Sequence, residues 1–473
     1  MPLHQSRRIY ADHALLTDGW HAQVVVDINA DGMISAVHSN VDPAQRRQQP
    51  CDWSCRHLVP AICNLHSHAF QRAMAGCSER LDSADKRNFW GWREHMYRLA
   101  NALTPDSLSA ISRLAYMEML EAGFAAVAEF HYVHHAADGS HYQPLEQMAQ
   151  GILAAAADSG IGLCLLPVLY TQADADGRAL AAQQLRFGNS VDDYLRLLQA
   201  INGCLDHHAA DTQLGMAAHS LRAVSPAQLQ CLLQQLQPQQ PLHIHVAEQR
   251  AEVTSVQQHL GLPPLQWLLE NTNIDQRWCL VHATHATTAE LKALQQTGCS
   301  IGLCPQTEAN LGDGVFALPD WLAMGGHSGI GTDANIRISV TEELRLLEYT
   351  QRLLQQRRQV LQPGDIADNI DAQGEALYRH ALRGGAQALQ RRSGVIASGH
   401  WADLLHLDGS VCGMDHLNRS NLIDGWLFAA GSDMVRDVWS AGRHVVVNGR
   451  HVQRQQICSD YAAAMRNIQH SLT

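Results

Sequence analysis

The sequence has little basic character and no long hydrophobic run. Asp and Glu number 46 against 34 Lys and Arg, and the net charge of −12, with no basic cluster, disfavours a nucleic-acid groove or an anionic membrane surface as partner. No stretch of about 18 apolar residues occurs, and the first segment of the chain lacks the apolar core of a secretion signal. We therefore expect a cytoplasmic protein.

The 12 cysteines show no pattern of a disulfide framework or a zinc ribbon. They are spaced singly apart from Cys51 and Cys55, and many lie in apolar runs such as "GLCLLPV" and "SIGLC". Thiols in such runs are typical of small buried side chains in a reducing compartment. The cysteines are therefore expected to belong to the core.

Both ends of the chain carry β-strand signals. The segment "HAQVVVDINADGMISAV" is broken by an Asp-Gly turn, and "DVWSAGRHVVVNGRHV" is broken by Asn448-Gly449 after the strand-like "ADLLHLD". We expect the two ends, residues 1–58 and 393–473, to form one small β-sandwich domain, with a helix at the C-terminus.

The middle of the chain, residues 59–392, alternates apolar runs with stretches of helical periodicity such as "PDSLSAISRLAYMEMLEAG". The candidate strands lie at roughly 57–63, 124–131, 161–168, 213–218, 241–247, 277–283, 299–304 and 328–332. Eight strands alternating with helices predict a protein of the α/β class, built as a (β/α)8 barrel of the TIM type.

Histidines recur at the ends of these predicted strands. The chain holds 28 histidines, so about 1.6 His-x-His pairs are expected by chance and the pair His66 and His68 alone proves nothing. In chain order the strand ends carry His66 and His68, His219 and Arg222, His243, His245 and Glu248, His282 and His285, and Asp333. Because the C-terminal ends of barrel strands meet at one mouth, these side chains predict an active site there.

The expected metal ligands are His66, His68, His245 and Asp333. Residues i and i+2 of a strand point to the same side, so His66 and His68 converge, and imidazole with carboxylate suits a divalent cation. We expect one metal ion per chain, with zinc first and iron or manganese also compatible. His243, in contrast, is expected to be a core histidine.

The catalytic residues are expected to be Glu248, His282 and Asp333. A bound cation lowers the pKa of its water towards neutrality and so provides hydroxide as the nucleophile. Glu248 follows His245 by three residues and is placed to carry a proton to a leaving nitrogen. His282 is expected to contact the attacking water or polarise the substrate, and Asp333 to take the proton of the water.

Several motifs resemble the amidohydrolase superfamily: the His-x-His pair, "HVAE", "VH" and "GTD" at strands one, five, six and eight. The resemblance implies a metal-dependent (β/α)8 barrel and a small β domain made from both chain ends. Members with two metals carry a carboxylated lysine at strand four, where this chain has "GMAAHSLR". The resemblance therefore implies a single metal.

Within that superfamily the chain resembles the deiminases that hydrolyse N-formimidoyl-L-glutamate to N-formyl-L-glutamate and ammonia in histidine degradation. The stretches that carry the resemblance are "NLHSHAFQRAMAG", "FWGWREHMYRLA", "HSLRAVSP", "HIHVAEQ", "PLQWLLEN", "DQRWCLVHATHAT" and "TEANLGDG". The substrate has two carboxylates, which the fork of an arginine suits. Arg222 is placed at the mouth by its strand, and the resemblance implies substrate contacts for Gln71, Arg93, Tyr132 and His219, as well as a homodimer.

Two alternatives stay open. The first is another amidohydrolase deaminase, acting on a purine, cytosine or a related ring. The second is a metal-free barrel kept as a scaffold. The chain also departs from the family pattern at Ala61, at Ala218 and in "TDAN", residues 332–335, and we expect this last change to affect the mouth beside Asp333.

Overall fold

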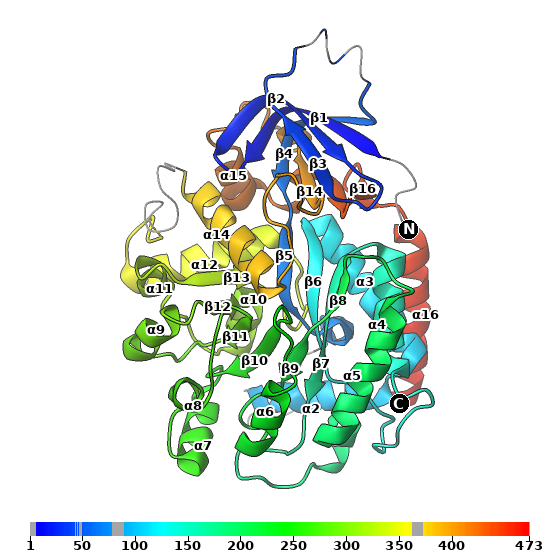
Figure 1. The fold of residues 1–473 in the computed structure, drawn as a ribbon, viewed down its shortest axis with the longest axis vertical. Coiled ribbons are helices and arrows are strands. Elements are labelled where there is room, and N and C mark those ends of the chain that lie inside the picture. The colour runs from blue at the N-terminus through cyan, green and yellow to red at the C-terminus, as the bar shows by residue number, and fades with distance from the viewer. Residues whose placement is uncertain are drawn as a thin grey trace.

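The strands of the computed structural model form two separate sheets, one small and one barrel-like (Figure 1). The structure describes residues 6–42, 44, 46, 50–77, 89–361 and 372–472. Of the three expected domain ranges, the extreme residues 1–5 and 473 lie outside this description. The division into 1–58, 59–392 and 393–473 stays our proposal.

The small sheet contains both ends of the chain, as expected. Its strands are β1 (Arg7–Leu16), β2 (Gly19–Ile28), β3 (Ile34–His38), β4 (Trp53–Pro60), β14 (Leu404–Leu407), β15 (Val435–Ser440), β16 (Arg443–Val447) and β17 (Arg450–His451). They pair in the order β17-β16-β15-β14-β4-β1-β2-β3, so hydrogen bonds join all of them in one mixed sheet. The predicted turn is present: Asn448 and Gly449 have φ of 54° and 76°, as a two-residue hairpin of type I′ requires.

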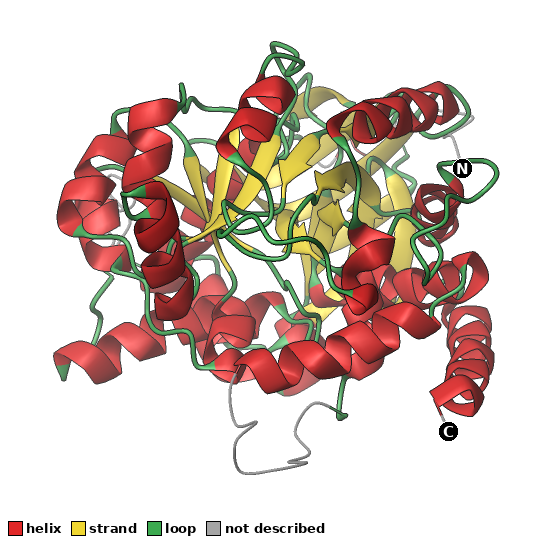
Figure 2. Ribbon diagram, turned by 90° about the horizontal axis from the view of Figure 1, so that it is seen from below, coloured by secondary structure: helices red, strands yellow, loops and turns green. Residues whose placement is uncertain are grey.

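The second sheet is the predicted barrel. Its strands are β5 (Ile62–Ser67), β6 (Phe124–His131), β7 (Gly162–Leu169), β8 (Thr212–Leu214), β9 (Met216–Ala218), β10 (Leu242–Val246), β11 (Trp278–His282), β12 (Ser300–Leu303) and β13 (His327–Ile330). Neighbouring strands are parallel, β8 is an extra strand beside β7, and a parallel bridge between Ser67 and Asp333 links the first strand to the last. Figure 2 shows the strands surrounded by helices.

The helices alternate with the strands and cover the barrel. They are α2 (Phe89–Ala102), α3 (Pro105–Ala122), α4 (Gln147–Ser159), α5 (Val191–Leu205), α6 (Pro226–Leu233), α7 (Arg250–Leu260), α8 (Pro264–Asn271), α9 (Thr288–Gln295), α10 (Pro305–Leu311), α11 (Leu318–Ala323), α12 (Val340–Gln355), α14 (Gln373–Ala388), α15 (Leu422–Gly425) and α16 (Arg454–Leu472). Thr104 and Ser107 cap the start of α3, and Gly123 ends it with φ of 104°. Within the described ranges, no helix combines the length and apolar content needed to cross a lipid bilayer.

Two predicted strands are each divided in the structure. The run 213–218 contains β8 and β9, with Gly215 between them. The run 57–63 is not a single strand, because β4 ends at Pro60 in the small sheet and β5 begins at Ile62 in the barrel. Between them, the Ala61 N–H donates to the Asp403 carbonyl oxygen, 2.9 Å away. The chain therefore passes from one sheet to the other within an unbroken apolar segment, and hydropathy contains no signal for that change.

Buried side chains explain why the barrel forms. Every residue of β5, β6, β7, β10 and β11 is buried, as in a parallel sheet covered on both sides. Eleven cysteines have described side chains, and all eleven are free thiols. Six are buried, as expected of core residues, whereas three are partly exposed and two are exposed. His243 is a core residue whose Nε2 lies 2.8 Å from the Ala388 carbonyl oxygen.

The small sheet lies at the end of the barrel where β5 begins, so it leaves the C-terminal strand ends open (Figure 1).

Candidate active site

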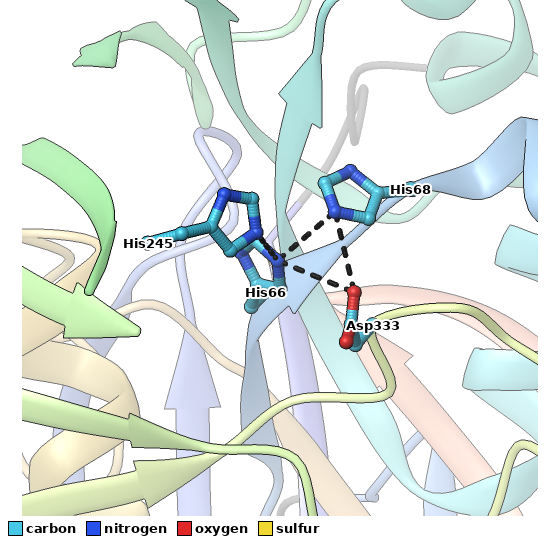
Figure 3. Close-up of side chains that lie close together, drawn as sticks. All are labelled: His66, His68, His245 and Asp333. Atoms are coloured by element: carbon cyan, nitrogen blue, oxygen red, sulfur yellow. Dashed lines mark hydrogen bonds and ion pairs between the residues drawn. The ribbon is translucent and has the colours of Figure 1, made fainter. Parts of the chain in front are cut away.

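Three strand ends bring the predicted metal ligands together (Figure 3). His66 Nε2 lies 3.2 Å from His68 Nε2 and 3.0 Å from His245 Nε2. Asp333 Oδ1 lies 3.4 Å from His66 Nε2 and 3.2 Å from His68 Nε2. All four residues are buried, and their ligand atoms lie within 4.8 Å of one another. The barrel therefore contains a buried metal site of three imidazoles and one carboxylate.

Hydrogen bonds on the far side of two rings show which nitrogen faces this site. His68 Nδ1 donates to the Phe130 carbonyl oxygen at 3.0 Å, and His245 Nδ1 donates to the His219 carbonyl oxygen at 3.0 Å. In a neutral imidazole the Nε2 atom then carries a lone pair. Lone pairs and a carboxylate oxygen converging at about 3 Å repel one another unless a cation lies among them, so this donor set fits a divalent metal ion.

The barrel closes at the same place. The Asp333 N–H donates to the His66 carbonyl oxygen at 3.0 Å, and the His68 N–H donates to the Asp333 carbonyl oxygen at 2.9 Å. Gly331 permits this approach, because a Cβ there would lie 2.8 Å from the Cβ of His66. The backbone hydrogen bonds that close the barrel therefore also bring His66, His68 and Asp333 together.

The residues of "TDAN", 332–335, lie where the last barrel strand meets the first. Asn335 Nδ2 donates to Ser67 Oγ at 3.1 Å, and its Oδ1 accepts from Thr332 Oγ1 at 2.6 Å. Thr332 Oγ1 in turn accepts from Asn64 Nδ2 at 2.7 Å. Asn335 and Ala334 do not line the pocket described below, whereas Asp333 does. Thr332 and Asn335 therefore hold β5 to the chain after β13, and their side chains lie outside the pocket wall.

Glu248 and His282 flank the ligands. His282 Nε2 lies 3.9 Å from Glu248 Oε1 and 3.7 Å from Asp333 Oδ2. Burial raises the pKa of Glu248 to about 7. Burial opposes protonation of His282, but neighbouring carboxylates, Glu248 first, outweigh it and raise the pKa of His282 to about 10. Both side chains can therefore hold a proton near neutral pH.

The carboxylate of Glu252 holds the backbone of the turn that carries Glu248. Ala247 has φ of 51°, in the left-handed region, and its N–H donates to Glu252 Oε1 at 3.1 Å. The N–H of Glu248 donates to Glu252 Oε2 at 3.0 Å. His282 and Asp333 have φ of 71° and 45°, so left-handed backbone recurs at the three strand ends around the site. Such strain concentrates where structure positions functional side chains.

One pocket contains every predicted substrate contact. Its wall is formed by His68, Gln71, Trp92, Arg93, Met96, Tyr97, Tyr132, Tyr170, Phe187, His219, Arg222, His245, Glu248, His282, Leu311 and Asp333. Gln71 Nε2 donates to Tyr132 Oη at 2.9 Å. Gln71 Oε1 and Arg222 Nε are buried without a hydrogen-bond partner among the described residues. A bound polar molecule can satisfy these two atoms.

Part of the pocket is electropositive, because Arg93 and Arg222 both line it. Burial lowers the pKa of Arg93, and the charge of Arg222 acts in the same direction. Although burial also opposes the charge of Arg222, the carboxylates of Glu252 and Glu248 raise the pKa of Arg222. Burial lowers the pKa of His219 and keeps this ring neutral. Two guanidinium groups thus face a single buried space.

Sequence reasoning did not identify Glu308 or the aromatic wall. Glu308 Oε1 lies 3.2 Å from His282 Nδ1, on the side of the ring away from the pocket. Tyr170 and Tyr97 both hydrogen-bond Gln184 Nε2, at 2.9 and 3.2 Å. Glu308 follows β12 by five residues. A carboxylate shortly after a barrel strand is the sequence signal by which Glu308 could have been predicted. Tyr170 directly follows β7 and has the same kind of signal, whereas Trp92, Tyr97 and Phe187 have none, because they come from α2 and from a 3-10 helix at Ala182–Phe187.

Comparisons with known proteins agree with this site. The amidohydrolase family matches residues 57–451, and the formimidoylglutamate deiminase HutF N-terminal domain matches residues 6–49. The chain is 46% identical over 450 residues to a formimidoylglutamate deiminase of Pseudomonas aeruginosa, covering 95% of this chain and 96% of the relative.

Solved structures show the same fold. An amidohydrolase from Brucella melitensis superposes with a TM-score of 0.90 at 41% identity, covering 98% of this chain and 100% of the other. An adenosine deaminase from Xanthomonas campestris, solved with bound zinc, gives a TM-score of 0.79 at 22% identity over 98% of each chain. The chain belongs to the amidohydrolase family and, within it, to the formimidoylglutamate deiminases.

Proposed function

We propose that the chain hydrolyses N-formimidoyl-L-glutamate to N-formyl-L-glutamate and ammonia, a step of histidine degradation. One observation carries the proposal: a buried donor set of three imidazoles and a carboxylate shares a pocket with the guanidinium groups of Arg93 and Arg222. The proposed substrate has the matching parts, a formimidoyl carbon to be hydrolysed and two carboxylates to be bound.

The substrate carboxylates are assigned to the electropositive side of the pocket. Arg222 would donate through its unpartnered Nε, and Arg93 would provide the second positive charge. Gln71, Tyr132 and His219 line the same pocket and would orient the substrate backbone. The Tyr132 ring lies beside His68 and the His219 ring beside His245, with centroids 5.1 Å apart in each pair. Two fixed charges at one end of a buried pocket direct the formimidoyl head to the other end.

His66, His68, His245 and Asp333 would hold one divalent ion, and we propose zinc because imidazole with carboxylate in a small set of ligands suits it. When bound, such an ion polarises a water molecule and makes hydroxide available near neutral pH. Asp333 Oδ2 would accept the proton of that water, and His282 Nε2, 3.7 Å away, would hydrogen-bond the attacking oxygen.

Glu248 is assigned the transfer of a proton to the leaving nitrogen. Its carboxyl is buried, with a pKa raised to about 7 by that burial, so it can both hold and release a proton at neutral pH. Hydroxide from the water would add to the formimidoyl carbon while Asp333 holds the other proton of that water. The terminal nitrogen would receive one proton from Glu248 and the one held by Asp333, and the bond from the carbon to this nitrogen would break to release ammonia. The hydroxyl proton on the same carbon would return to Glu248 as the formyl carbonyl forms. The net reaction consumes one water.

The test is ammonia release from N-formimidoyl-L-glutamate by purified protein whose metal content has been measured. We expect release with about one metal per chain, loss of release in His245→Gln, and retention in His243→Gln, a matched change two residues away in the same strand. A fully metal-loaded protein that deaminates 5′-methylthioadenosine or cytosine and leaves the formimidoyl substrate intact would instead support the ring-deaminase alternative. A protein that binds no metal would support the scaffold alternative.

The expected homodimer and the expected cytoplasmic location both stay predictions. Size-exclusion chromatography with light scattering checks the first, and fractionation of cells checks the second.

A further inference from the structure

Glu308 contacts His282 on the side of the ring that faces away from the pocket. Glu308 Oε1 lies 3.2 Å from His282 Nδ1 and also accepts from the Cys304 N–H at 2.9 Å. Both side chains are almost completely buried, with exposed fractions of 5% for Glu308 and 1% for His282. This contact is therefore made inside the protein, shielded from solvent.

The shared oxygen decides the direction of the hydrogen bond. A backbone N–H can only donate, so Glu308 Oε1 is an acceptor towards Cys304. The same oxygen then accepts the proton on Nδ1 of His282, which leaves Nε2 on the opposite side of the ring, facing the site. That nitrogen is the one facing Glu248 and Asp333, at 3.9 and 3.7 Å.

The backbone conformation at His282 also bears on how its ring is held in place. His282 ends β11 with φ of 71°, and Ala283 follows with φ of 49°. A side chain on left-handed backbone at a strand end is not oriented by the regular sheet geometry. A hydrogen bond from outside the pocket can therefore hold the ring in one orientation, in addition to its packing against His245.

We propose that Glu308 is a positioning residue: by accepting the Nδ1 proton of His282, it fixes the ring so that Nε2 faces the reacting atoms. This inference rests on the proposed hydrolysis, in which His282 acts through Nε2. Glu308 itself does not line the pocket and is not assigned a contact with the substrate.

Three variants test the role. Glu308→Leu removes the acceptor, and Glu308→Gln keeps a neutral acceptor at the same place. Glu343→Leu is the matched control, because Glu343 Oε2 accepts a backbone N–H of the same helix, from Gln306 at 2.9 Å, without contact to His282. We expect kcat to fall about 10- to 100-fold in Glu308→Leu, with KM and metal content near the wild-type values. Glu308→Gln should recover most of that loss, and Glu343→Leu should keep kcat within about threefold.

The outcomes separate this inference from the proposed function. A metal-loaded wild-type protein that releases no ammonia contradicts the function. With an active wild type, equal kcat in Glu308→Leu and Glu343→Leu contradicts the positioning role, and so does a Glu308→Gln variant as slow as Glu308→Leu. A readout that needs no substrate is ¹⁵N NMR of histidine-labelled protein, with His282→Gln identifying the signal. We expect a hydrogen-bonded Nδ1–H at His282 in the wild type and in Glu308→Gln, and the loss of that hydrogen bond in Glu308→Leu; an unchanged Nδ1–H signal in Glu308→Leu overturns the inference.

Discussion

Asp333 and His66 are joined twice. The Asp333 N–H donates to the His66 carbonyl oxygen at 3.0 Å, and Asp333 Oδ1 lies 3.4 Å from His66 Nε2. The first contact closes the barrel between its last and first strands, and the second belongs to the metal site. A cation held by both side chains therefore also holds the two edges of the barrel together.

Metal removal is accordingly expected to destabilise the folded protein. A ligand that binds only the native state at 100 times its dissociation constant adds about 2.7 kcal/mol to the free energy of unfolding. The apo protein should melt several degrees below the metal-loaded protein in calorimetry, and added zinc should restore the melting temperature. His245→Gln should no longer respond to zinc; an identical melting temperature with and without metal in the wild type would contradict the coupling.

Gly331→Ala is expected to weaken metal binding. A Cβ at this position would lie 2.8 Å from the Cβ and carbonyl oxygen of His66, which forces that ligand away. We predict a fall in metal affinity of about 10- to 100-fold, measured by competition with a chromogenic chelator. Gly203→Ala is the control, because Gly203 lies in α5 with nothing within 4 Å of a Cβ. Equal affinity in both variants would show that the closure tolerates the methyl group.

Arg222→Met is expected to raise KM much more than it lowers kcat. Arg222 lines the pocket and is assigned to a substrate carboxylate, and a hydrogen bond to a charged group contributes about 1.5–3 kcal/mol, or about 10- to 100-fold in KM. Steady-state kinetics with N-formimidoyl-L-glutamate provide the measurement, and the exposed Arg466→Met is the control. A loss confined to kcat would assign Arg222 to the reacting atoms instead.

The buried Glu129 predicts a pH dependence of stability. Its Oε1 accepts from the Ala69 N–H at 2.7 Å, its Oε2 has no hydrogen-bond partner among the described residues, and burial raises the pKa of Glu129 to about 8. Between the ordinary value of 4.5 and about 8 the folded state binds this proton and the unfolded state releases it. The free energy of unfolding therefore falls as pH rises through that window.

Glu129→Gln should flatten this pH dependence, because the amide resembles the protonated acid. Urea unfolding at pH 5 and pH 9 is expected to show a smaller loss of stability in Glu129→Gln than in the wild type, and the exposed Glu270→Gln should behave as the wild type does. Parallel curves for all three proteins would mean that Glu129 stays ionised in the fold.

Much of the fold follows from local pattern. Alternation of apolar strands with helical periodicity predicts the barrel, and the Asn448-Gly449 turn predicts a hairpin that the structure contains. The metal ligands were found because parallel strands bring their C-terminal ends to one mouth, so position in a strand converts directly into position in space. Where a site residue directly follows a strand, its place was predictable.

Tertiary structure decided what has no local signal. The change of sheet at Ala61 occurs inside one apolar run, where hydrophobicity is the same on both sides of the change. The contact of Glu308 with His282, and the places of Trp92, Tyr97 and Phe187 in the pocket wall, depend on helices whose course the strand pattern does not specify.

The sequence by itself determined the class of fold, the donor set and the mouth at which it lies, because strand periodicity is a short-range property. Only the folded chain decided which nitrogen of His68 and His245 faces the metal site and that Asn335 hydrogen-bonds Ser67. It also decided that Glu308 contacts the side of the His282 ring that faces away from the pocket. These features depend on hydrogen bonds between residues that are 26 to 268 positions apart in the sequence. Packing of the folded chain, and not the local sequence, determines which of these residues become hydrogen-bond partners.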